Sequence, residues 1–385
     1  MEKLFKLLHK DKQYTRIAGD LSSGKDCHVC GLWGSSAAFL IAGLASKKSI
    51  TGKGRLLFVA PGIEDAEDVL EDISIFLPEN AMLFPASEGA SSDDAHPDSS
   101  AYAQQLSILH KLSINKTSNT NTSKIIIAPI QALLQKVPSP ETIENNILTI
   151  KIGQEHKQDF LINWLVEGGF ERTGMVEFPG EFSIRGGIMD VFPYSFDRPY
   201  RIEFFGDEVD SIRMFNVETQ TSESEINECR IPGIQDSTTG KSGAAANTLI
   251  DYMPVGSLIV FKEYEKIVNK ANTIIDNMDS KVPYFDNIIK SCKGFTKIYL
   301  SNLRFESEKG CSFNVKPSDQ FDHDVVNSIK KVNEISQSYK RTIIFCSNEA
   351  EEQRLEELLS ASNPRKKTGK KKNTLQPYRI SERAS

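Results

Sequence analysis

The chain has 385 residues, of which 39% are apolar and 25% charged, and its formal net charge is −6. This length is too great for one ordinary hydrophobic core and predicts two or three domains. No apolar run approaches the roughly 20 residues that a membrane span requires, and the first residues lack the apolar stretch and cleavage site of a secretory signal. We therefore predict a cytoplasmic protein without a membrane partner.

Charge is distributed unevenly along the chain. Residues 365–385 contain eight Lys or Arg and one Glu, a charge of +7, which leaves −13 on the first 364 residues given the total of −6. A domain that grips DNA through its phosphates has the opposite balance, so we predict no direct binding of duplex DNA by the folded body. The basic run is either a solvated tail or a nucleic-acid arm, and a solvated tail is the commoner case.

The cysteines and histidines offer little for metal or nucleophilic chemistry. The six cysteines are scattered, and in a cytoplasmic chain of this size they are predicted to be reduced thiols. Cys27, His28 and Cys30 have the spacing of half a metal site, but no second ligand pair follows at zinc spacing. His96 lies in an acidic, serine-rich stretch whose composition is that of a loop. We predict no metal and no cofactor.

In chain order, several segments pair a buried strand with an amphipathic helix, which is typical of an α/β domain with a parallel sheet. In RLLFVAPGIEDAEDVLEDISIFL, the apolar run Leu56–Ala60 predicts a strand, and the following helix places Ala66, Val69, Leu70 and Ile73 on one face. The same pattern begins again at Lys124, Ser257 and Thr342.

The segment from about 150 to 220 has a different pattern. It opens with a predicted helix that presents Phe160, Leu161, Trp164 and Leu165 and ends at Gly168 and Gly169. EFSIRGGIMDVFP and PYRIEFFGDEVDSIRMF then alternate apolar and polar residues, and the Gly-Asp-Glu at 206–208 is placed where a hairpin would turn. We predict a small α+β insert with antiparallel strands.

The insert carries the strongest motif. GEFSIRGGIMDVFP followed by RPYRIEFFGDEVDSIRMFNVETQTS resembles the insert domain shared by the excinuclease subunit UvrB and the transcription-repair coupling factor (Mfd). Both families carry a Gly-Glu/Thr-Phe-x-x-Arg-Gly strand, an apolar strand ending in Phe-Pro, and an R-[IV]-[ED]-F-F-G-D-E hairpin, which this chain matches in order. GLWGSSAAFLIAGL and APIQALLQKVP upstream, and LIDYMPVGSLIVF downstream, extend the resemblance to the two α/β halves of the coupling factor.

The loop at Gly31 distinguishes the two families. The segment here resembles the position at which UvrB proteins carry a working phosphate-binding loop. In such a loop, backbone N–H groups cradle phosphates, Lys neutralises charge and Thr binds Mg²⁺. The aligned run here is Gly31, Leu32, Trp33, Gly34, Ser35, Ser36, Ala37 and Ala38. Ala37 replaces the Lys and Ala38 the hydroxyl, so we predict that the chain does not hydrolyse ATP.

The second hairpin of the insert is the candidate site. Because side chains alternate along a strand, Arg201, Glu203 and Phe205 are predicted to share one face, while Ile202 and Phe204 face the core. An exposed aromatic beside an arginine is the composition of an interface hot spot.

Two interpretations of this hairpin stay open from the pattern alone. In the first it docks a partner; in the second Phe205 is tucked under the amino-terminal helix, and Arg201 pairs with Glu203 or Asp207. The resemblance favours docking. In both families this surface contacts UvrA, and the matching positions here are Arg185, Arg201 and Phe205.

We thus predict an α/β fold in which a degenerate, RecA-like P-loop domain occupies residues 1–148 and 221–361. It is split by the UvrB interaction domain at 149–220 and followed by a disordered basic tail at 362–385. The resemblance implies a non-catalytic, monomeric module of transcription-coupled nucleotide excision repair that recruits UvrA, with RNA polymerase and DNA bound only through domains absent from this chain. The alternative is a UvrB-like, ATP-dependent damage-recognition or helicase subunit.

Overall fold

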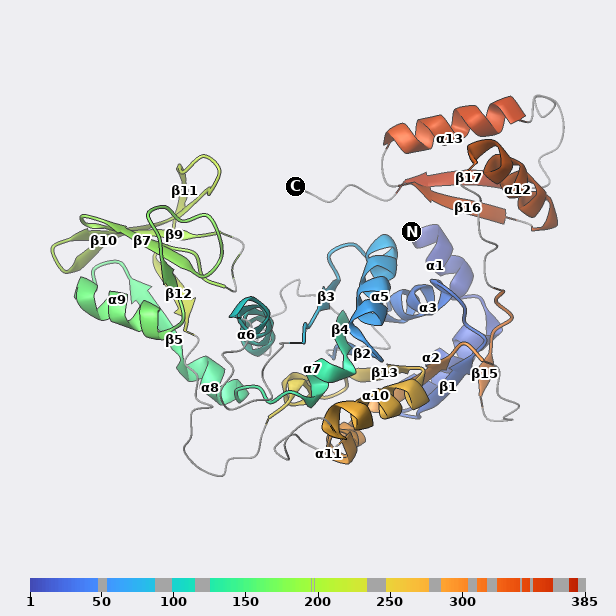
Figure 1. The fold of residues 1–385 in the computed structure, drawn as a ribbon, viewed down its shortest axis with the longest axis horizontal. Helices are drawn as coiled ribbons and strands as arrows, with labels where there is room; N and C mark the ends of the chain where they lie inside the picture. The colour runs from blue at the N-terminus through green and yellow to red at the C-terminus, as the bar shows by residue number, and fades with distance from the viewer. Residues whose placement is uncertain are drawn as a thin grey trace.

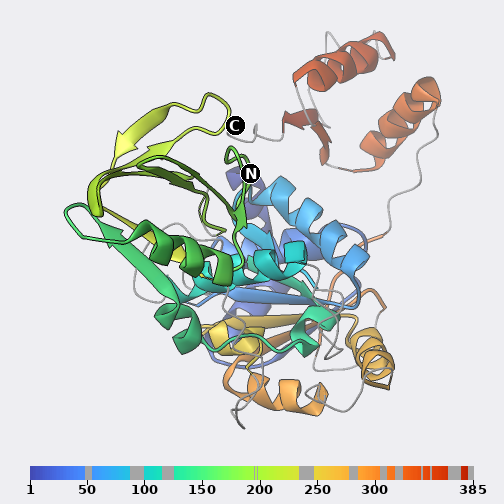
Figure 2. The ribbon, with the colours of Figure 1, turned by 60° about the vertical axis from the view of Figure 1, so that its left-hand side comes forward.

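The computed structural model describes residues 1–47, 54–86, 99–114, 125–194, 196, 198–233, 247–276, 285–303, 310–316, 324–339, 341–346, 349–362 and 374–379. The elements form an α/β domain, an insert and a small carboxyl-terminal unit (Figures 1 and 2).

The α/β domain is built on a seven-stranded sheet in which every neighbouring pair of strands is parallel. Its order is β15 (Cys311–Ser312), β1 (Cys27–Cys30), β14 (Thr296–Ser301), β13 (Leu258–Lys262), β2 (Leu56–Ala60), β4 (Ile125–Pro129) and β3 (Ala81–Leu83). Along β2, Leu56 and Phe58 face one core whereas Leu57 and Val59 face the other. Helices cover both faces, which is why the central strands are continuous apolar runs.

Two sets of helices cover the two faces of this sheet. The first core is closed by α1 (Glu2–Leu8), α2 (Lys12–Ser22), α3 (Ser36–Ala45) and α5 (Ile63–Phe76). The second is closed by α6 (Ser99–Ile114), α7 (Ile130–Leu134), α8 (Pro140–Asn145), α10 (Tyr264–Asp276) and α11 (Phe285–Ser291), with the 3-10 turns η1 (Leu249–Tyr252) and η2 (Cys292–Gly294). This arrangement confirms the predicted α/β class with a parallel sheet.

Strands from distant parts of the sequence meet at the centre of the sheet, where β2 pairs with β13. Just before them, the Leu258 amide donates to the Arg55 carbonyl at 2.8 Å, and the Arg55 amide donates to the Ser257 hydroxyl at 3.0 Å. A Cβ atom on Gly54 would lie 2.5 Å from the carbonyl carbon of Gly256. The backbones of the two segments that lead into β2 and β13 are therefore in contact.

The insert lies to one side of the α/β domain, in green in Figure 1. The antiparallel pair β5 (Ile147–Lys151) and β12 (Glu228–Pro232) connects the two parts. A second sheet has the order β11 (Ser222–Glu225), β10 (Glu208–Phe215), β9 (Tyr200–Phe205), β8 (Ile188–Val191), β7 (Glu181–Arg185) and β6 (Glu171–Arg172). Its pairs are antiparallel except β6 with β7.

Helix α9 (Gln158–Glu167) packs on the insert sheet and ends at Gly168, as predicted. Leu161 and Leu165 are buried in the core of the insert. Phe160, which the sequence groups with these leucines, is 54% exposed. The reason is the 3.6-residue period, which turns position 160 away from the stripe formed by 161 and 165.

The carboxyl-terminal unit consists of α12 (Val325–Ser338), β16 (Arg341–Cys346), α13 (Glu349–Ser362) and β17 (Thr374–Arg379). β16 pairs in parallel with β17, in a sheet separate from the seven-stranded one. The sequence predicts a disordered tail from 362, and β17 differs from that prediction; the rest of the tail lies outside the described residues. Pairing at β17 satisfies backbone groups that β16 would otherwise leave open along its edge.

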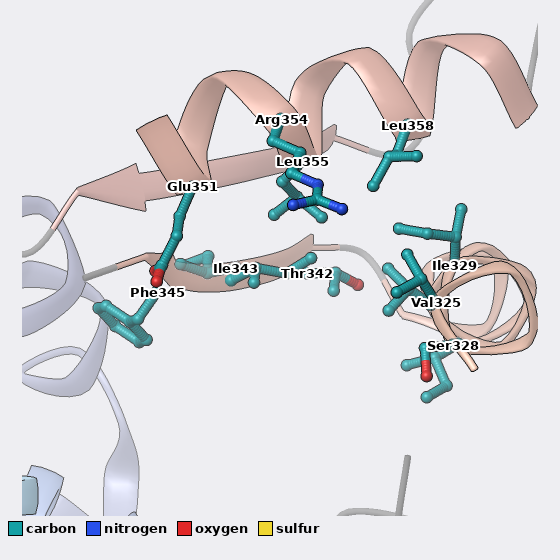
Figure 3. Close-up of a pocket in the computed structure, with 13 residues that line it drawn as sticks. Val325, Ser328, Ile329, Thr342, Ile343, Phe345, Glu351, Arg354, Leu355 and Leu358 are labelled. Atoms are coloured by element: carbon teal, nitrogen blue, oxygen red, sulfur yellow. The ribbon is translucent and has the colours of Figure 1, made fainter. Parts of the chain in front are cut away.

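An apolar cavity of about 590 Å³ lies between α12, β16 and α13 (Figure 3). It is lined mainly by aliphatic side chains, with Glu351 and Arg354 among them. Phe345 of β16 also packs edge-on against Phe76 of α5, at 5.8 Å between ring centroids. This contact joins the unit to the first core of the α/β domain.

Candidate protein-docking surface

Two tight hairpins lie side by side at one end of the insert sheet. The β7–β8 hairpin turns at Gly186 and Gly187 between the paired residues Arg185 and Ile188, and the β9–β10 hairpin turns at 206–207. Gly186 has a φ of +60° and Gly206 a φ of +65°, which favour glycine. We call the two turns and their flanking residues, 185–188 and 205–208, the hairpin edge.

The hairpin edge is held from both sides by backbone contacts. The Phe204 amide donates to the Gly187 carbonyl at 2.7 Å, and a Cβ atom at Gly187 would lie 2.8 Å from the Phe204 oxygen. The loop between β5 and α9 braces the second turn, because the His156 amide donates to the Asp207 carbonyl at 2.7 Å. The turns are thus fixed before any partner arrives.

Apolar surface is presented along this edge. Phe205 is 83% exposed and Ile188 is 38% exposed, and the Arg185 side chain is also exposed. The alternative in which Phe205 is tucked under the amino-terminal helix is therefore wrong: the two-residue turn places Phe205 at the tip of the sheet, beyond its core. An exposed aromatic side chain and an exposed guanidinium on the same edge are suited to binding another protein.

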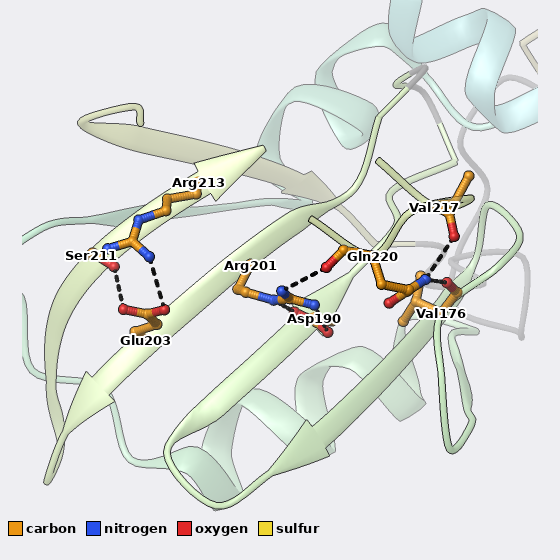
Figure 4. Close-up of polar contacts among 8 residues, drawn as sticks. All are labelled: Val176, Asp190, Arg201, Glu203, Ser211, Arg213, Val217 and Gln220. Carbon is orange, nitrogen blue, oxygen red and sulfur yellow. Dashed lines mark hydrogen bonds and ion pairs between the residues drawn. The ribbon is translucent and has the colours of Figure 1, made fainter. Parts of the chain in front are cut away.

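Arg201 has a different environment from that of Phe205. Its Nε and Nη2 donate to the two carboxylate oxygens of Asp190 at 2.7 and 2.9 Å, and its Nη1 donates to the Gln220 carbonyl at 3.2 Å (Figure 4). The guanidinium carbon lies 4.6 Å from the centre of the Phe215 ring. Hydrogen bonding to Asp190 raises the pKa of Arg201. The alternative in which Arg201 pairs with Glu203 or Asp207 is therefore wrong, because its carboxylate partner is Asp190.

The reason is the strand register, which places Asp190 of β8 directly opposite Arg201 of β9. Glu203 is occupied elsewhere: it accepts from the Ser211 hydroxyl at 2.9 Å and from Arg213 at 3.1 Å (Figure 4). Sequence reasoning missed Asp190, although an acidic residue inside the apolar strand IMDVF signals a buried carboxylate that needs a partner.

The segment predicted as a degenerate phosphate loop joins β1 to α3. Gly31 and Gly34 have φ values of +75° and +55°, and Ala37 and Ala38 are buried in the first core. The Ser35 hydroxyl, at the start of the helix, donates to the Asp72 carboxylate at 2.5 Å. Burial raises the pKa of Asp72.

If this segment aligns with a phosphate loop as predicted, a neighbouring carboxylate and two alanine methyl groups stand where phosphate binding would need a cation and a hydroxyl. Ser36 is also engaged, because its hydroxyl donates to the Trp33 carbonyl at 2.8 Å. Backbone amides at a helix start favour an anion, but a carboxylate beside them opposes a second negative charge.

The described part of the chain gives little support for a reactive cysteine or a metal site. All six cysteines are free and buried, and burial raises the pKa of Cys27 and of Cys229 to about 12. His28 stacks on Tyr299, and the described residues contain no group of three potential metal ligands. His96 and its aspartates lie outside the described residues. Among the described helices, none combines the length and apolar character needed to cross a membrane.

Part of the chain matches a known domain family, and a larger part is similar to known proteins. The family model of the UvrB interaction domain matches residues 148–236. The chain is 32% identical over 224 residues to the transcription-repair-coupling factor of Bacillus subtilis, 28% over 215 residues to that of Escherichia coli, and 27% over 252 residues to that of Myxococcus xanthus.

These three alignments cover 58%, 56% and 62% of the chain, respectively, but only 18%, 18% and 20% of the relatives. The chain thus spans about a fifth of the length of the curated relatives it matches.

Proposed function

Residues 148–236 are a UvrB interaction domain within a module that resembles transcription-repair-coupling factors, and from this we propose that the chain is a docking module of transcription-coupled nucleotide excision repair. Its partner is UvrA. The hairpin edge, with Arg185, Arg201 and Phe205 on and beside it, carries the recruitment. The observation that supports this most is the 83% exposure of Phe205 on a turn fixed by backbone hydrogen bonds.

A docking role rather than nucleotide hydrolysis is favoured by the β1–α3 loop. With Ala37 and Ala38 buried and Asp72 bonded to Ser35, the loop lacks the positive charge and the magnesium ligand that phosphoryl transfer requires. In this proposal the module acts without a cofactor, as a monomer in the cytoplasm, and RNA polymerase and DNA are contacted by other parts of a complete coupling factor.

The test is a titration of the purified chain against UvrA of the same organism, with and without ATP. Phe205→Ala is expected to weaken binding at least about tenfold, since truncating a hot-spot aromatic typically costs about 2 kcal/mol or more and about 1.4 kcal/mol corresponds to tenfold. The matched control is Phe178→Ala, because Phe178 is 65% exposed but lies before β7, at the opposite end of that strand from the hairpin edge.

ATP is expected to leave the affinity unchanged, and the chain incubated alone with ATP is expected to release no inorganic phosphate. Equal weakening by Phe178→Ala and Phe205→Ala would place the contact away from the hairpin edge. Absence of binding by the unmodified chain would remove UvrA as its partner, and release of inorganic phosphate from ATP by the chain alone would revive the hydrolytic alternative.

A further inference from the structure

The hydrogen bonds of Arg201 leave little of its guanidinium for a partner. Nε and Nη2 form a two-point contact with Asp190, Nη1 donates to the Gln220 carbonyl, and one face of the group lies over Phe215. The Arg201 side chain is only 17% exposed. A carboxylate from another protein would have to compete with Asp190, whose own side chain is 3% exposed.

Asp190 in turn depends on Arg201. It lies in β8 between Ser183 of β7 and Arg201 of β9, and the Ser183 hydroxyl has no hydrogen-bond partner among the residues described. A buried carboxylate is costly unless it is paired, so removing Arg201 would leave an uncompensated charge inside the sheet.

The pair also anchors the loops that cover this side of the sheet. Gln220, whose carbonyl accepts from Arg201, donates from its side chain to the carbonyls of Val176 and Val217 at 3.2 and 2.8 Å (Figure 4). Val176 and Phe215 form a small second core beside them. Arg201 therefore links β9 to the turn at 216–221 and to the loop at 173–180.

Of the arginines on this side of the sheet, Arg213 is likewise paired, with Glu203 at 3.1 Å. Arg185 has no ion pair or hydrogen bond assigned in the described part of the insert, and it is exposed. It stands beside the turn at 186–187 and directly opposite Ile188. The hairpin edge thus combines a free guanidinium with the apolar surface of Ile188 and Phe205.

We propose that Arg201 and Asp190 are positioning residues, and that the partner is contacted by Phe205, Ile188 and Arg185. This rests on the proposed function. The complementary surface on UvrA is then an apolar socket for the aromatic ring with a carboxylate at its rim, because two of the three nearby guanidinium groups are neutralised within the insert itself.

The test compares Arg201→Gln, Asp190→Asn and the double variant with both changes, using UvrA affinity and melting temperature. Each single change is expected to lower the melting temperature and to weaken binding about tenfold, because it leaves one polar group unmatched. The double variant replaces the ion pair by two neutral groups that can hydrogen-bond, so it is expected to recover affinity to within about threefold of the unmodified chain.

Salt supplies a second measurement. Arg185→Gln is expected to leave the melting temperature unchanged and to reduce the dependence of the affinity on ionic strength, whereas the double variant keeps that dependence. The proposal is overturned if the double variant binds no better than Arg201→Gln, or if its affinity loses the salt dependence. In either case, binding of UvrA by the unmodified chain would still support the docking function. Only a failure of the unmodified chain to bind UvrA would remove both the docking function and the positioning role of Arg201.

Discussion

His110 on α6 is a buried histidine at the junction between the α/β domain and the insert. Its ring packs against Phe196 at 6.2 Å between centroids, and neither ring nitrogen has a hydrogen-bond partner in the described part of the chain. One helical turn earlier, the Ser107 hydroxyl donates to the Tyr194 carbonyl at 2.6 Å. Burial, with smaller contributions from Arg230 and Lys111, lowers the pKa of His110 to about 4.

This pKa makes stability depend on pH in one direction. Because the folded chain holds His110 neutral while the unfolded chain binds a proton near its ordinary pKa of 6.5, stability falls as the pH drops from about 6.5 towards 4. The total effect is on the order of 3 kcal/mol. Denaturant unfolding at a series of pH values, with His110→Phe as comparison, checks this. Parallel curves for the two proteins would show that His110 does not titrate as described.

At the residue scale, the sequence predicted that Arg201 and Phe205 lie on the face opposite Ile202 and Phe204, because alternation along a strand needs no knowledge of neighbours. It did not predict the partner of Arg201. That partner, Asp190, is set by the register of β8 against β9, which depends on the placement of turns in both hairpins. The roles of Arg185, Arg201 and Phe205 in binding stay predictions.

At the scale of elements, the backbone contact between Gly54 and Gly256, just before the parallel strands β2 and β13, makes stability sensitive to substitution. A Cβ atom on Gly54 would overlap the backbone of Gly256, which cannot move without displacing one of the two central strands. Gly54→Ala is therefore expected to lower the free energy of unfolding by about 2 kcal/mol or more. Chemical denaturation measures this difference.

The matched control is Gly19→Ala. Gly19 lies inside α2, has no atom within 4 Å of an added Cβ, and should gain roughly 0.5–1 kcal/mol from the substitution. Similar destabilisation of both variants would mean that Gly54 has as much space for a side chain as the exposed Gly19.

The elements themselves were predicted unevenly. The strand at Leu56–Ala60 and the parallel α/β pattern are confirmed, since a short apolar run between turn signals specifies a buried strand. The similar run at β16 lies outside the main sheet, beside β17. The apolar pattern predicts that a segment forms a strand, but it does not predict with which other strand that segment pairs.

At the scale of the whole molecule, the insert has a hydrophobic core of its own. Every buried residue of that core lies between Ile150 and Ile231, and the hairpin edge is braced only by insert residues in the contacts described above. Residues 147–233, produced alone, are therefore expected to unfold cooperatively and to bind UvrA within about threefold of the whole chain.

Calorimetry and the same titration check this expectation. A broad, non-cooperative transition would show that α6 is needed to complete the fold of the insert. Cooperative unfolding with a much weaker affinity would instead show that the α/β domain supplies part of the contact surface.

The domain-level resemblance was the part of the function most accessible from sequence, and the match to the UvrB interaction domain confirms it. The bracing by the 152–157 loop could not be predicted, since it joins irregular backbone to a turn about 50 residues away.

The β5–β12 pair also determines how the molecule would respond to force. One end of both strands faces the α/β domain, where Ile147 is opposite Pro232, and the other end faces the insert, where Lys151 is opposite Glu228. A pull on the insert would stretch the two strands together, side by side, without sliding one past the other. Their hydrogen bonds would carry little of the load, so the packing of α6 against the insert would yield first and the insert would swing while remaining folded.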